Sequence, residues 1–416
     1  MKTASALALL GAALPALATP ALPLSTSSRW ILDSNGDRVK LTCANWAGHL
    51  EANTPEGLNK QPVATIAEFI ASQGFNCVRL TYSIDYALNP TLSMEDSFTQ
   101  VAPSNTPVNA STWTGIYNDI VSVNPWAATA TLQDAYSEVI SSLWANGVMT
   151  ILDNHVSKAS WCCNLTDGNG WWDTAYGYNS ANSRYFNTTN WYQGLDDIAT
   201  WAATQDGVIA MSLRNELRAF LLQSTGAGSD DWYNILTTAA TGVHSKNSDL
   251  LIIIGGANSA EDLSYLKTQG TLDFSAWSGK HVWEWHNYAF SVQFDLFQGD
   301  CSALQDAWGY YDGFVLTQGE DYTAPLILSE FGFGMTGGPN SGLTDGDYSY
   351  FTCLKEYLGD NDSEWIIWAI QGSYYVREGQ VDYDEGYGVL DHNWDGLRNT
   401  ALPTLLGSLF NATQGP

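Results

Sequence analysis

Short apolar runs that alternate with helical segments constrain the fold of this chain more than any other feature. Continuous apolar strands separated by helices indicate a parallel sheet that is buried on both faces. The predicted strands span residues 41–44, 75–82, 148–154, 208–213, 250–255, 281–285, 325–329 and 364–370. The predicted helices span residues 62–73, 131–146, 195–204, 231–244, 260–268, 301–309, 348–358 and 397–409.

Eight strand-then-helix units favour the α/β class and, within it, a (β/α)8 barrel with long loops. A doubly wound sheet is the alternative, but the strand–helix turns show no glycine-rich phosphate loop to support it. We find no internal repeat or linker, so residues 19–416 are predicted to form one catalytic domain. In a barrel, the long segments 83–130, 156–190 and 291–300 would lie at the C-terminal face and could wall a substrate site.

Residues 1–18 have the pattern of a signal peptide. Lys2 precedes an apolar stretch too short to span a membrane, and Ala16-Leu17-Ala18 has the small-x-small form of a cleavage site. The remaining chain is therefore predicted to be soluble, secreted and extracellular. Five glycosylation sequons fit that route: Asn109, Asn164, Asn187, Asn361 and Asn411.

The charge balance excludes some partners. Lys and Arg total 16 while Asp and Glu total 44, which gives a net charge of −28. Nucleic acids, anionic membranes and acidic polymers would be repelled. Trp, Tyr and Phe make up 13% of the residues, and these aromatics either pack the core or stack on sugar rings. Trp46, Trp161, Trp171 and Trp172 are candidate sugar platforms, for which packing is an equally good explanation.

Six cysteines allow 15 disulfide connectivities in an oxidising compartment. We predict a bridge between the neighbours Cys162 and Cys163 and another between Cys301 and Cys353. Cys43 and Cys77 are predicted to be small core residues on adjacent strands. The chain has no C-x-x-C pattern, so zinc and haem sites have little support.

Polar residues gather at the C-terminal ends of six predicted strands. In a barrel enzyme, functional groups meet at this face, so this recurrence indicates a site. The residues are Arg79, Asn154, His155, Asn215, Glu216, His286, Tyr288, Glu330 and Trp368.

Glu216 and Glu330 are the best pair of carboxylic residues for glycoside hydrolysis. A retaining enzyme needs one carboxyl to protonate the leaving oxygen and a second to attack the anomeric carbon. A lone Glu after a strand is more often a solvated cap or an ion-paired residue, but the paired context favours catalysis. Side chains alternate along a strand, so Glu284 is predicted to lie on the same side as His286. It is either a third acid in the site or a buried Glu with a charged partner, and the second interpretation is the commoner one for such a residue.

These residues, in this order, resemble glycoside hydrolase family 5, the cellulase family of a clan with (β/α)8 barrels. Asn215-Glu216 resembles the family's Asn-Glu pair, in which Glu is the acid/base and Asn contacts the sugar 2-hydroxyl. Glu330, in Ser329-Glu330-Phe331-Gly332, resembles the nucleophile. The remaining functional positions of the family are matched by Arg79, His155, His286, Tyr288 and Trp368.

The segment around Asn154-His155 and Trp161-Cys162-Cys163 resembles a less-studied fungal and plant branch of that family. This loop bears on the substrate and not on the type of reaction.

The resemblance gives each residue an expected role. Repulsion from ionised Glu330 would help Glu216 to hold its proton. Arg79 and Tyr288 can donate to Glu330 and keep it ionised. His155 and His286 can bind sugar hydroxyls or orient the carboxylates, and Trp368 can form the floor of the sugar subsite.

Metal sites are not favoured. His281 to His286 does not form H-E-x-x-H. Asp382, Asp384 and Glu385 could hold calcium, but a solvated acidic loop is the commoner explanation. We therefore expect no cofactor.

The sequence predicts a monomeric, retaining β-glycosidase that acts on β-linked glucan in the manner of an endoglucanase. The alternatives are an exo-acting β-glucosidase, a β-mannan hydrolase and a catalytically silent carbohydrate-binding barrel. The last would be expected to lack one of the two Glu residues, and both are present.

Overall fold

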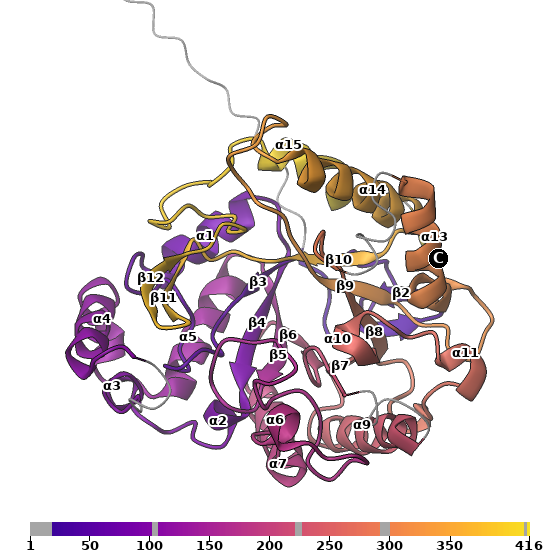
Figure 1. The fold of residues 1–416 in the computed structure, drawn as a ribbon, viewed down its shortest axis with the longest axis horizontal. Helices are drawn as coiled ribbons and strands as arrows, with labels where there is room; N and C mark the ends of the chain where they lie inside the picture. Colours follow the sequence, from indigo (N-terminus) through magenta and orange to yellow (C-terminus); the bar gives the residue numbers. More distant parts are fainter. Residues whose placement is uncertain (1–18, 102–106, 221–226, 292–299, 412–413) are drawn as a thin grey trace, which may run out of the picture.

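A closed barrel of eight parallel strands forms the centre of the computed structural model (Figure 1). The structure describes residues 19–101, 107–220, 227–291, 300–411 and 414–416. Around the barrel the strand order is β10-β3-β4-β5-β6-β7-β8-β9, with β10 pairing with both β3 and β9. The strands are β3 (Thr42–Trp46), β4 (Cys77–Ser83), β5 (Met149–Val156), β6 (Val208–Ser212), β7 (Leu251–Gly255), β8 (His281–His286), β9 (Leu326–Phe331) and β10 (Glu364–Ile367). The predicted (β/α)8 barrel and its eight strands are confirmed.

Helices surround the strands in Figure 1. The longer ones are α1 (Val63–Ser72), α4 (Ala110–Val123), α5 (Leu132–Ala145), α7 (Thr188–Ala202), α9 (Ala227–Lys246), α13 (Cys301–Tyr311) and α14 (Asp345–Asn361). Their buried residues are largely apolar, as in α1, α5 and α7. Helix α5 begins at a capping box, in which Thr131 and Asp134 satisfy each other's backbone N–H groups. The shorter helices are α2 (Ile84–Ala87), α3 (Met94–Thr99), α6 (Ser180–Ser183), α10 (Ala257–Ala260), α11 (Leu266–Gln269) and α15 (Leu402–Leu406), with 3-10 turns at Pro125–Ala128, Ser275–Trp277, Gly313–Leu316 and Gly407–Phe410.

The predicted helix at residues 260–268 is wrong as a continuous element. Only the four-residue helices α10 and α11 form there, and Asn258, Ser259 and Ala260 have left-handed backbone conformations with φ between 57° and 61°. The predicted helix at 397–409 is likewise reduced to α15 and one 3-10 turn. Pro403 lies in the first turn of α15, where proline is tolerated but blocks extension of the helix toward the N-terminus.

Two β-hairpins accompany the barrel. β1 (Ser25–Ser27) and β2 (Trp30–Leu32) precede the first barrel strand, and Ile31 packs with Ile151 and Ile327 in one apolar cluster. β11 (Ser373–Arg377) and β12 (Gln380–Asp384) follow β10, and Tyr374 packs with Leu50. Neither hairpin was predicted.

Three disulfides use all six cysteines. Cys162–Cys163 and Cys301–Cys353 are paired as predicted. Cys43 and Cys77 are core residues on adjacent strands, as predicted, but the prediction did not pair them and they form a third disulfide. They are direct neighbours in the register of β3 and β4, with Cα atoms 4.6 Å apart, a separation that suits a disulfide.

Among the described residues, we find no helix long and apolar enough to cross a membrane. The predicted signal peptide at 1–18 and most of the predicted wall segment 291–300 lie outside the described residues.

Candidate active site

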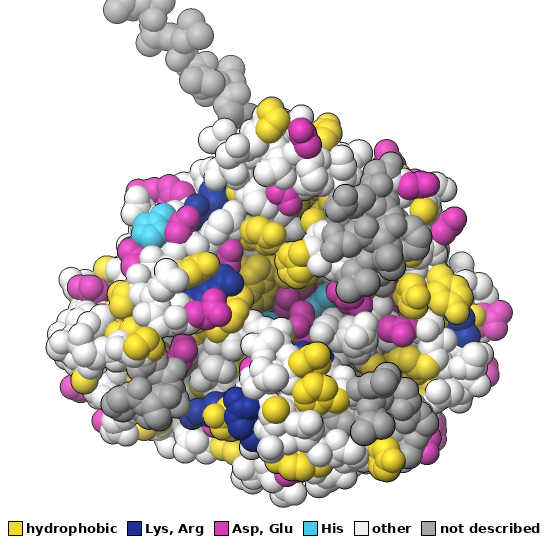
Figure 2. All heavy atoms as spheres, viewed as in Figure 1, with side chains coloured by type: hydrophobic (Ala, Val, Ile, Leu, Met, Phe, Trp, Pro, Cys, Tyr) yellow, Lys and Arg dark blue, Asp and Glu magenta, His cyan; other side chains and the backbone are white. Residues whose placement is uncertain are grey.

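The predicted site residues meet at the C-terminal ends of the barrel strands. Figure 2 shows a hollow near the middle of one face, where acidic and histidine side chains lie between hydrophobic ones. Arg79 comes from β4, His155 from β5, His286 from β8 and Glu330 from β9. Asn215 and Glu216 follow β6, while Tyr288 and Trp368 follow β8 and β10. All eight side chains are thus placed at one end of the barrel.

Glu216 and Glu330 lie close to each other, beside His286. A carboxylate oxygen of each residue and a ring nitrogen of His286 lie within 4.8 Å of one another. The side chain of Glu216 is 17% exposed and that of Glu330 is 6% exposed. Retaining glycosidases hold their two carboxyl groups about 5–5.5 Å apart, whereas inverting enzymes need about 6.5–9.5 Å. The close approach therefore fits the retaining geometry.

Glu330 accepts two strong hydrogen bonds. The Arg79 guanidinium donates to one carboxylate oxygen at 2.9 Å, and the Tyr288 hydroxyl donates to the other at 3.0 Å. These are the donors expected to keep Glu330 ionised. Burial opposes them: it raises the pKa of Glu330 to about 7, although His286 and Arg79 act to lower it. The expected donors are present, but they do not outweigh burial in the free site.

His286 lies between the two carboxylates. Its Nδ1 is 3.1 Å from Glu216 Oε1 and 3.8 Å from Glu330 Oε2, and its Nε2 is 3.4 Å from Glu284 Oε1. Burial alone would lower the pKa of His286, but Glu330, Glu216 and Glu284 outweigh it and raise that pKa to about 10. At neutral pH His286 is therefore an imidazolium that donates from both nitrogens.

Glu216 has an unusual backbone conformation. Its φ is 40°, a left-handed value that residues other than glycine rarely adopt. The backbone is fixed on both sides: Asn215 N–H donates to Asn154 O at 2.9 Å, and Leu217 O accepts from Ser259 N–H at 2.8 Å. Strained residues held in this way cost about 1–3 kcal/mol and cluster at functional sites.

Asn215 and His155 are oriented by a chain of hydrogen bonds. Asn215 Oδ1 accepts from Arg79 at 2.9 Å, so its amide nitrogen points to His155 Nε2, 3.3 Å away. His155 Nδ1 lies 2.6 Å from Asp153 Oδ2. Burial, together with Arg79 and His286, lowers the pKa of His155 well below its ordinary value. His155 is therefore neutral: its Nδ1 donates to Asp153 and its Nε2 accepts from Asn215.

Sequence reasoning missed two residues that hold Arg79. One is Asp153, which accepts from Arg79 at 2.8 Å, and the other is Asn45, which accepts at 3.0 Å. A period of two along β5 puts Asp153 on the same side as His155, so the alternation could have identified it.

Glu284 is a buried residue with charged partners, as the commoner of the two interpretations predicted, and not a third acid facing the substrate. It accepts from Arg79 at 2.9 Å and from Ser212 and Ser329 at 2.6 Å. Burial would raise the pKa of Glu284, but Arg79, His286 and Ser212 outweigh burial and lower it to about 2. Glu284 is therefore a fixed negative charge beneath Arg79 and His286.

Trp368 forms one wall of the site and is 5% exposed. Its ring stacks on His155, with centroids 5.6 Å apart, and it meets the edge of Trp161 at 6.2 Å. Trp161 is itself held by Arg377, whose guanidinium carbon lies 3.5 Å from the ring centroid. The other candidate platforms, Trp46, Trp171 and Trp172, are fully buried and pack the interior.

The acidic residues of the C-terminal hairpin are ion-paired. Asp382 binds Lys60 and His392, and Asp384 binds Arg398 and the same His392. Glu385 is buried and accepts from Tyr374 and Arg377. The expected solvated acidic loop is therefore a set of paired carboxylates, each with a cationic partner.

Two groups of described residues bring metal-ligand atoms together. The first is Glu216, His286 and Glu330, which are the two proposed catalytic carboxyls and the histidine between them. The second is His49, His155 and Cys162, and Cys162 is bound to Cys163.

Comparisons with known proteins agree with this geometry. Residues 32–373 match the family model described as cellulase (glycosyl hydrolase family 5). A glycosyl hydrolase 5 family protein of Chamaecyparis obtusa is 38% identical over 402 residues, which is 95% of this chain and 67% of that protein. Endoglucanase G of Acetivibrio thermocellus is 22% identical, covering 92% of this chain and 70% of the relative.

Solved structures share the fold. An endocellulase variant of Pyrococcus horikoshii, in complex with cellotetraose, superposes with a TM-score of 0.67 at 17% identity. The match covers 94% of this chain and 100% of that chain. At this identity the likeness shows the fold alone.

Proposed function

The chain belongs to glycosyl hydrolase family 5 and is a retaining glycoside hydrolase, and from this premise we propose that it is a secreted enzyme that hydrolyses β-linked glucan. In this proposal Glu330 is the nucleophile and Glu216 the general acid/base. Relatives that carry the name endoglucanase, and the cellotetraose bound to a protein of the same fold, support a glucan substrate.

The first step forms a glycosyl-enzyme bond. One Glu330 oxygen attacks the anomeric carbon as the glycosidic bond breaks, and protonated Glu216 gives its proton to the leaving oxygen. Arg79 and Tyr288 hold the Glu330 carboxylate in a fixed orientation. The His286 imidazolium stabilises negative charge on both carboxylates.

The second step releases the sugar. Glu216, now ionised, takes a proton from water, and the resulting hydroxide equivalent displaces Glu330 from the anomeric carbon. Glu330 carries no charge in the intermediate, so the two carboxyl groups do not repel each other during this step. Two inversions restore the original configuration.

Substrate-binding roles are proposed for the neutral groups around the pair. Asn215 has its oxygen fixed by Arg79 and one amide N–H directed at His155, so its second amide N–H is available to a hydroxyl such as the sugar 2-hydroxyl. His155 would bind a neighbouring hydroxyl through Nε2 by giving up its contact with Asn215, and Trp368 would offer its ring to the apolar face of the sugar.

Secretion is part of the proposal. It rests on the leader pattern at 1–18 and on the sequons, of which Asn109, Asn164, Asn187 and Asn411 are exposed. Mass spectrometry of protein recovered from a culture medium would test it. We expect a chain that begins after residue 18 and carries N-glycans; retention of residues 1–18 inside the cell would contradict secretion.

The observation that carries the catalytic proposal is the close approach of Glu216 and Glu330, with Glu330 held by Arg79 and Tyr288. The test compares wild type with Glu330→Ala and Glu216→Ala on aryl β-glycosides and β-linked oligosaccharides. We expect Glu330→Ala to abolish cleavage, and azide to rescue it with formation of the inverted glycosyl azide. Glu216→Ala should slow substrates with poor leaving groups most.

The same substrate panel separates the remaining alternatives. Internal cleavage of cello-oligosaccharides supports the proposed endoglucanase activity. Release of single glucose units would point to an exo-acting enzyme, and cleavage of mannan alone to a mannanase. Sugar binding without cleavage by wild type would contradict the catalytic proposal.

A further inference from the structure

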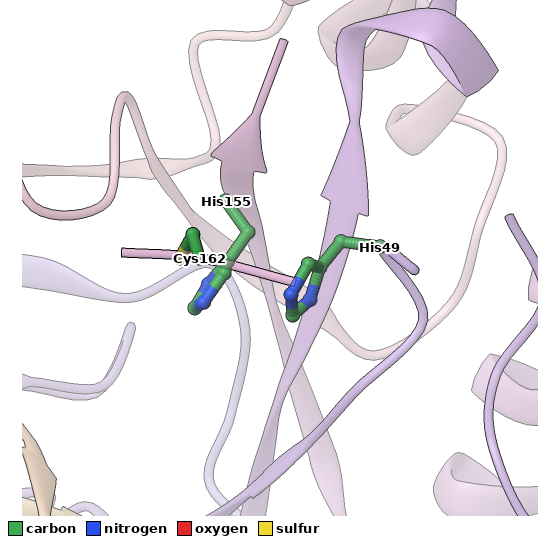
Figure 3. Close-up of side chains that lie close together, drawn as sticks. All are labelled: His49, His155 and Cys162. Carbon is green, nitrogen blue, oxygen red and sulfur yellow. The ribbon is translucent and has the colours of Figure 1, made fainter. Parts of the chain in front are cut away.

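His49, His155 and Cys162 form a buried cluster at one side of the active site (Figure 3). His49 follows β3, His155 lies in β5, and Cys162 lies in the loop after β5. One ring nitrogen of each histidine and the sulfur of Cys162 lie within 4.8 Å of one another. Imidazole nitrogen and cysteine sulfur are the ligands that soft and borderline metal ions prefer.

His49 has an unused ring nitrogen. Its side chain is fully buried and its ring stacks on that of His155, with centroids 3.9 Å apart. Its Nδ1 is hydrogen-bonded to Thr81 Oγ1 at 2.7 Å. Its Nε2 has no hydrogen-bond partner among the residues that the structure describes. A buried polar atom without a partner is costly, and a lone pair on this atom would suit a metal ion.

His155 is already arranged as metal ligands usually are. Its Nδ1–H points to the Asp153 carboxylate at 2.6 Å, which leaves the lone pair of Nε2 directed away from the strand. This carboxylate–histidine pairing orients most histidine ligands in metal sites.

The disulfide prevents the sulfur of Cys162 from acting as a metal ligand. In the Cys162–Cys163 bridge neither sulfur can become a thiolate, and the thiolate is the form that binds metal. The two sulfurs lie 3.9 Å and 3.5 Å from the amide nitrogen of Asn215. The disulfide therefore lies beside Asn215, one of the proposed substrate-binding residues.

We propose that the Cys162–Cys163 disulfide masks a soft-metal site, and that after its reduction His49, His155 and Cys162 bind an ion of the Zn²⁺ or Cd²⁺ class. A dithiol reductant supplies two electrons and two protons, becomes a disulfide itself and leaves two cysteine thiols. The Cys162 thiol loses its proton to solvent when the ion binds. Ligand atoms around a tetrahedral zinc ion lie about 3.5 Å apart, so atoms now within 4.8 Å need shifts of only about 1 Å.

Metal binding would stop hydrolysis if the proposed function is correct. The ion would take the Nε2 lone pair of His155, which now faces the Asn215 amide. Asn215 would lose this contact, and a cation would lie close to His155 Nε2, which is 4.0 Å from Glu330 Oε1. The binding itself does not depend on the proposed function and is measured separately.

The decisive variant is Cys163→Ser, which frees the Cys162 thiol and leaves the other two disulfides intact. The matched control is the double variant C162S/C163S, which lacks both sulfurs. We expect Cys163→Ser to bind one Cd²⁺ per chain by equilibrium dialysis, with sulfur-to-metal absorption in the ultraviolet. Its affinity should exceed that of the control by about a hundredfold, because a thiolate ligand is present only there.

Adding His49→Gln to Cys163→Ser tests whether the ion occupies this cluster. We expect about a tenfold or greater loss of Cd²⁺ affinity, comparable to the loss of an orienting group in known sites. Equal binding in the presence and absence of His49 would overturn the proposal. So would equal binding by Cys163→Ser and C162S/C163S.

Wild type gives a test without substitutions at the cysteines. Oxidised wild type should neither bind Cd²⁺ nor lose activity in its presence. Enzyme that has been reduced with dithiothreitol and then freed of the reductant should bind Cd²⁺ and lose activity. A chelator should restore that activity. Inhibition of the oxidised enzyme at the same Cd²⁺ concentration would overturn the masking role. If wild type cleaves no glycoside at all, the proposed function fails, but equilibrium dialysis still shows whether the metal site exists.

Discussion

Tyr288 is the residue whose contribution can be isolated most cleanly, because it offers a single hydroxyl to Glu330 at 3.0 Å. The proposed nucleophile must be ionised, so kcat/KM should rise with pH through the pKa of Glu330. Tyr288→Phe removes a donor to the ionised form and therefore raises that pKa. A hydrogen bond to a charged group contributes about 1.5–3 kcal/mol, so we expect the acid limb to move to higher pH by about one to two units.

A pH–rate profile of wild type and Tyr288→Phe checks this expectation. Tyr117→Phe is the matched control, since the Tyr117 hydroxyl donates to the backbone oxygen of Ala127 in a different part of the chain. The control should leave the acid limb in place. A limb that stays fixed in Tyr288→Phe, or moves to lower pH, would contradict the assigned donor role.

The candidate site was largely predictable at this scale because barrel geometry brings strand ends together. Glu216 and Glu330 are far apart in sequence, yet each follows or ends a strand of the same barrel. The supporting residues were missed: Asn45, which acts through Arg79, directly follows the predicted strand 41–44 and meets the same criterion as the other site residues. The protonation of His286 depends on three carboxylates from different segments, which a sequence pattern does not reveal.

At the scale of elements, the Cys43–Cys77 disulfide joins the neighbouring strands β3 and β4 across 34 residues. In the chain-entropy account, closing a loop of this size contributes about 3–4 kcal/mol. We expect the double variant C43A/C77A to lose about 3 kcal/mol in the free energy of urea unfolding. C162S/C163S is the control, because a bridge between adjacent residues closes almost no loop. A loss below about 1 kcal/mol would contradict the entropic estimate.

Local backbone chemistry explains which elements the sequence missed. Apolar residues at Ala260, Leu263 and Leu266 have helical spacing, but three left-handed residues and a contact to Leu217 prevent a continuous helix. The turn of the β11–β12 hairpin is Glu378-Gly379, both with positive φ. A two-residue loop ending in glycine is a hairpin signal, so this element could have been predicted.

At the scale of the whole molecule, the barrel encloses ionisable groups that folding holds neutral. Burial raises the pKa of several carboxyls. The pKa rises to about 7 for Glu51, Asp153, Glu261 and Glu330, and lies well above its ordinary value for Glu56 and Asp312. A raised carboxyl pKa contributes stability that is full below the unfolded pKa and is lost as pH rises through the folded value. Buried histidines act in the opposite direction, with pKa values below 6.5 for His49, His155 and His281.

Above pH 6.5 the carboxyls still change the stability with pH, whereas the buried histidines do not. There the three buried histidines are neutral in both the folded and the unfolded chain, so they no longer change stability with pH. The carboxyls and His286, whose pKa is raised to about 10, all lose stabilisation as pH rises. We therefore expect the melting temperature to fall between pH 6.5 and 8.5, a fall that a growing net negative charge reinforces.

Glu56→Gln tests the contribution of a single buried carboxyl to this fall. Glu56 is fully buried, its pKa is raised well above 4.5, and it accepts from the Tyr375 backbone N–H at 2.6 Å. A glutamine has no proton to lose, so the variant should become more stable relative to wild type as pH rises, by up to about 1.4 kcal/mol per pH unit. The exposed Glu68→Gln makes the same charge change on α1 and should leave the slope unaltered. Urea unfolding in steps from pH 5 to pH 8.5 decides the matter, since parallel slopes for Glu56→Gln and wild type over the whole range would mean that folding does not hold Glu56 protonated.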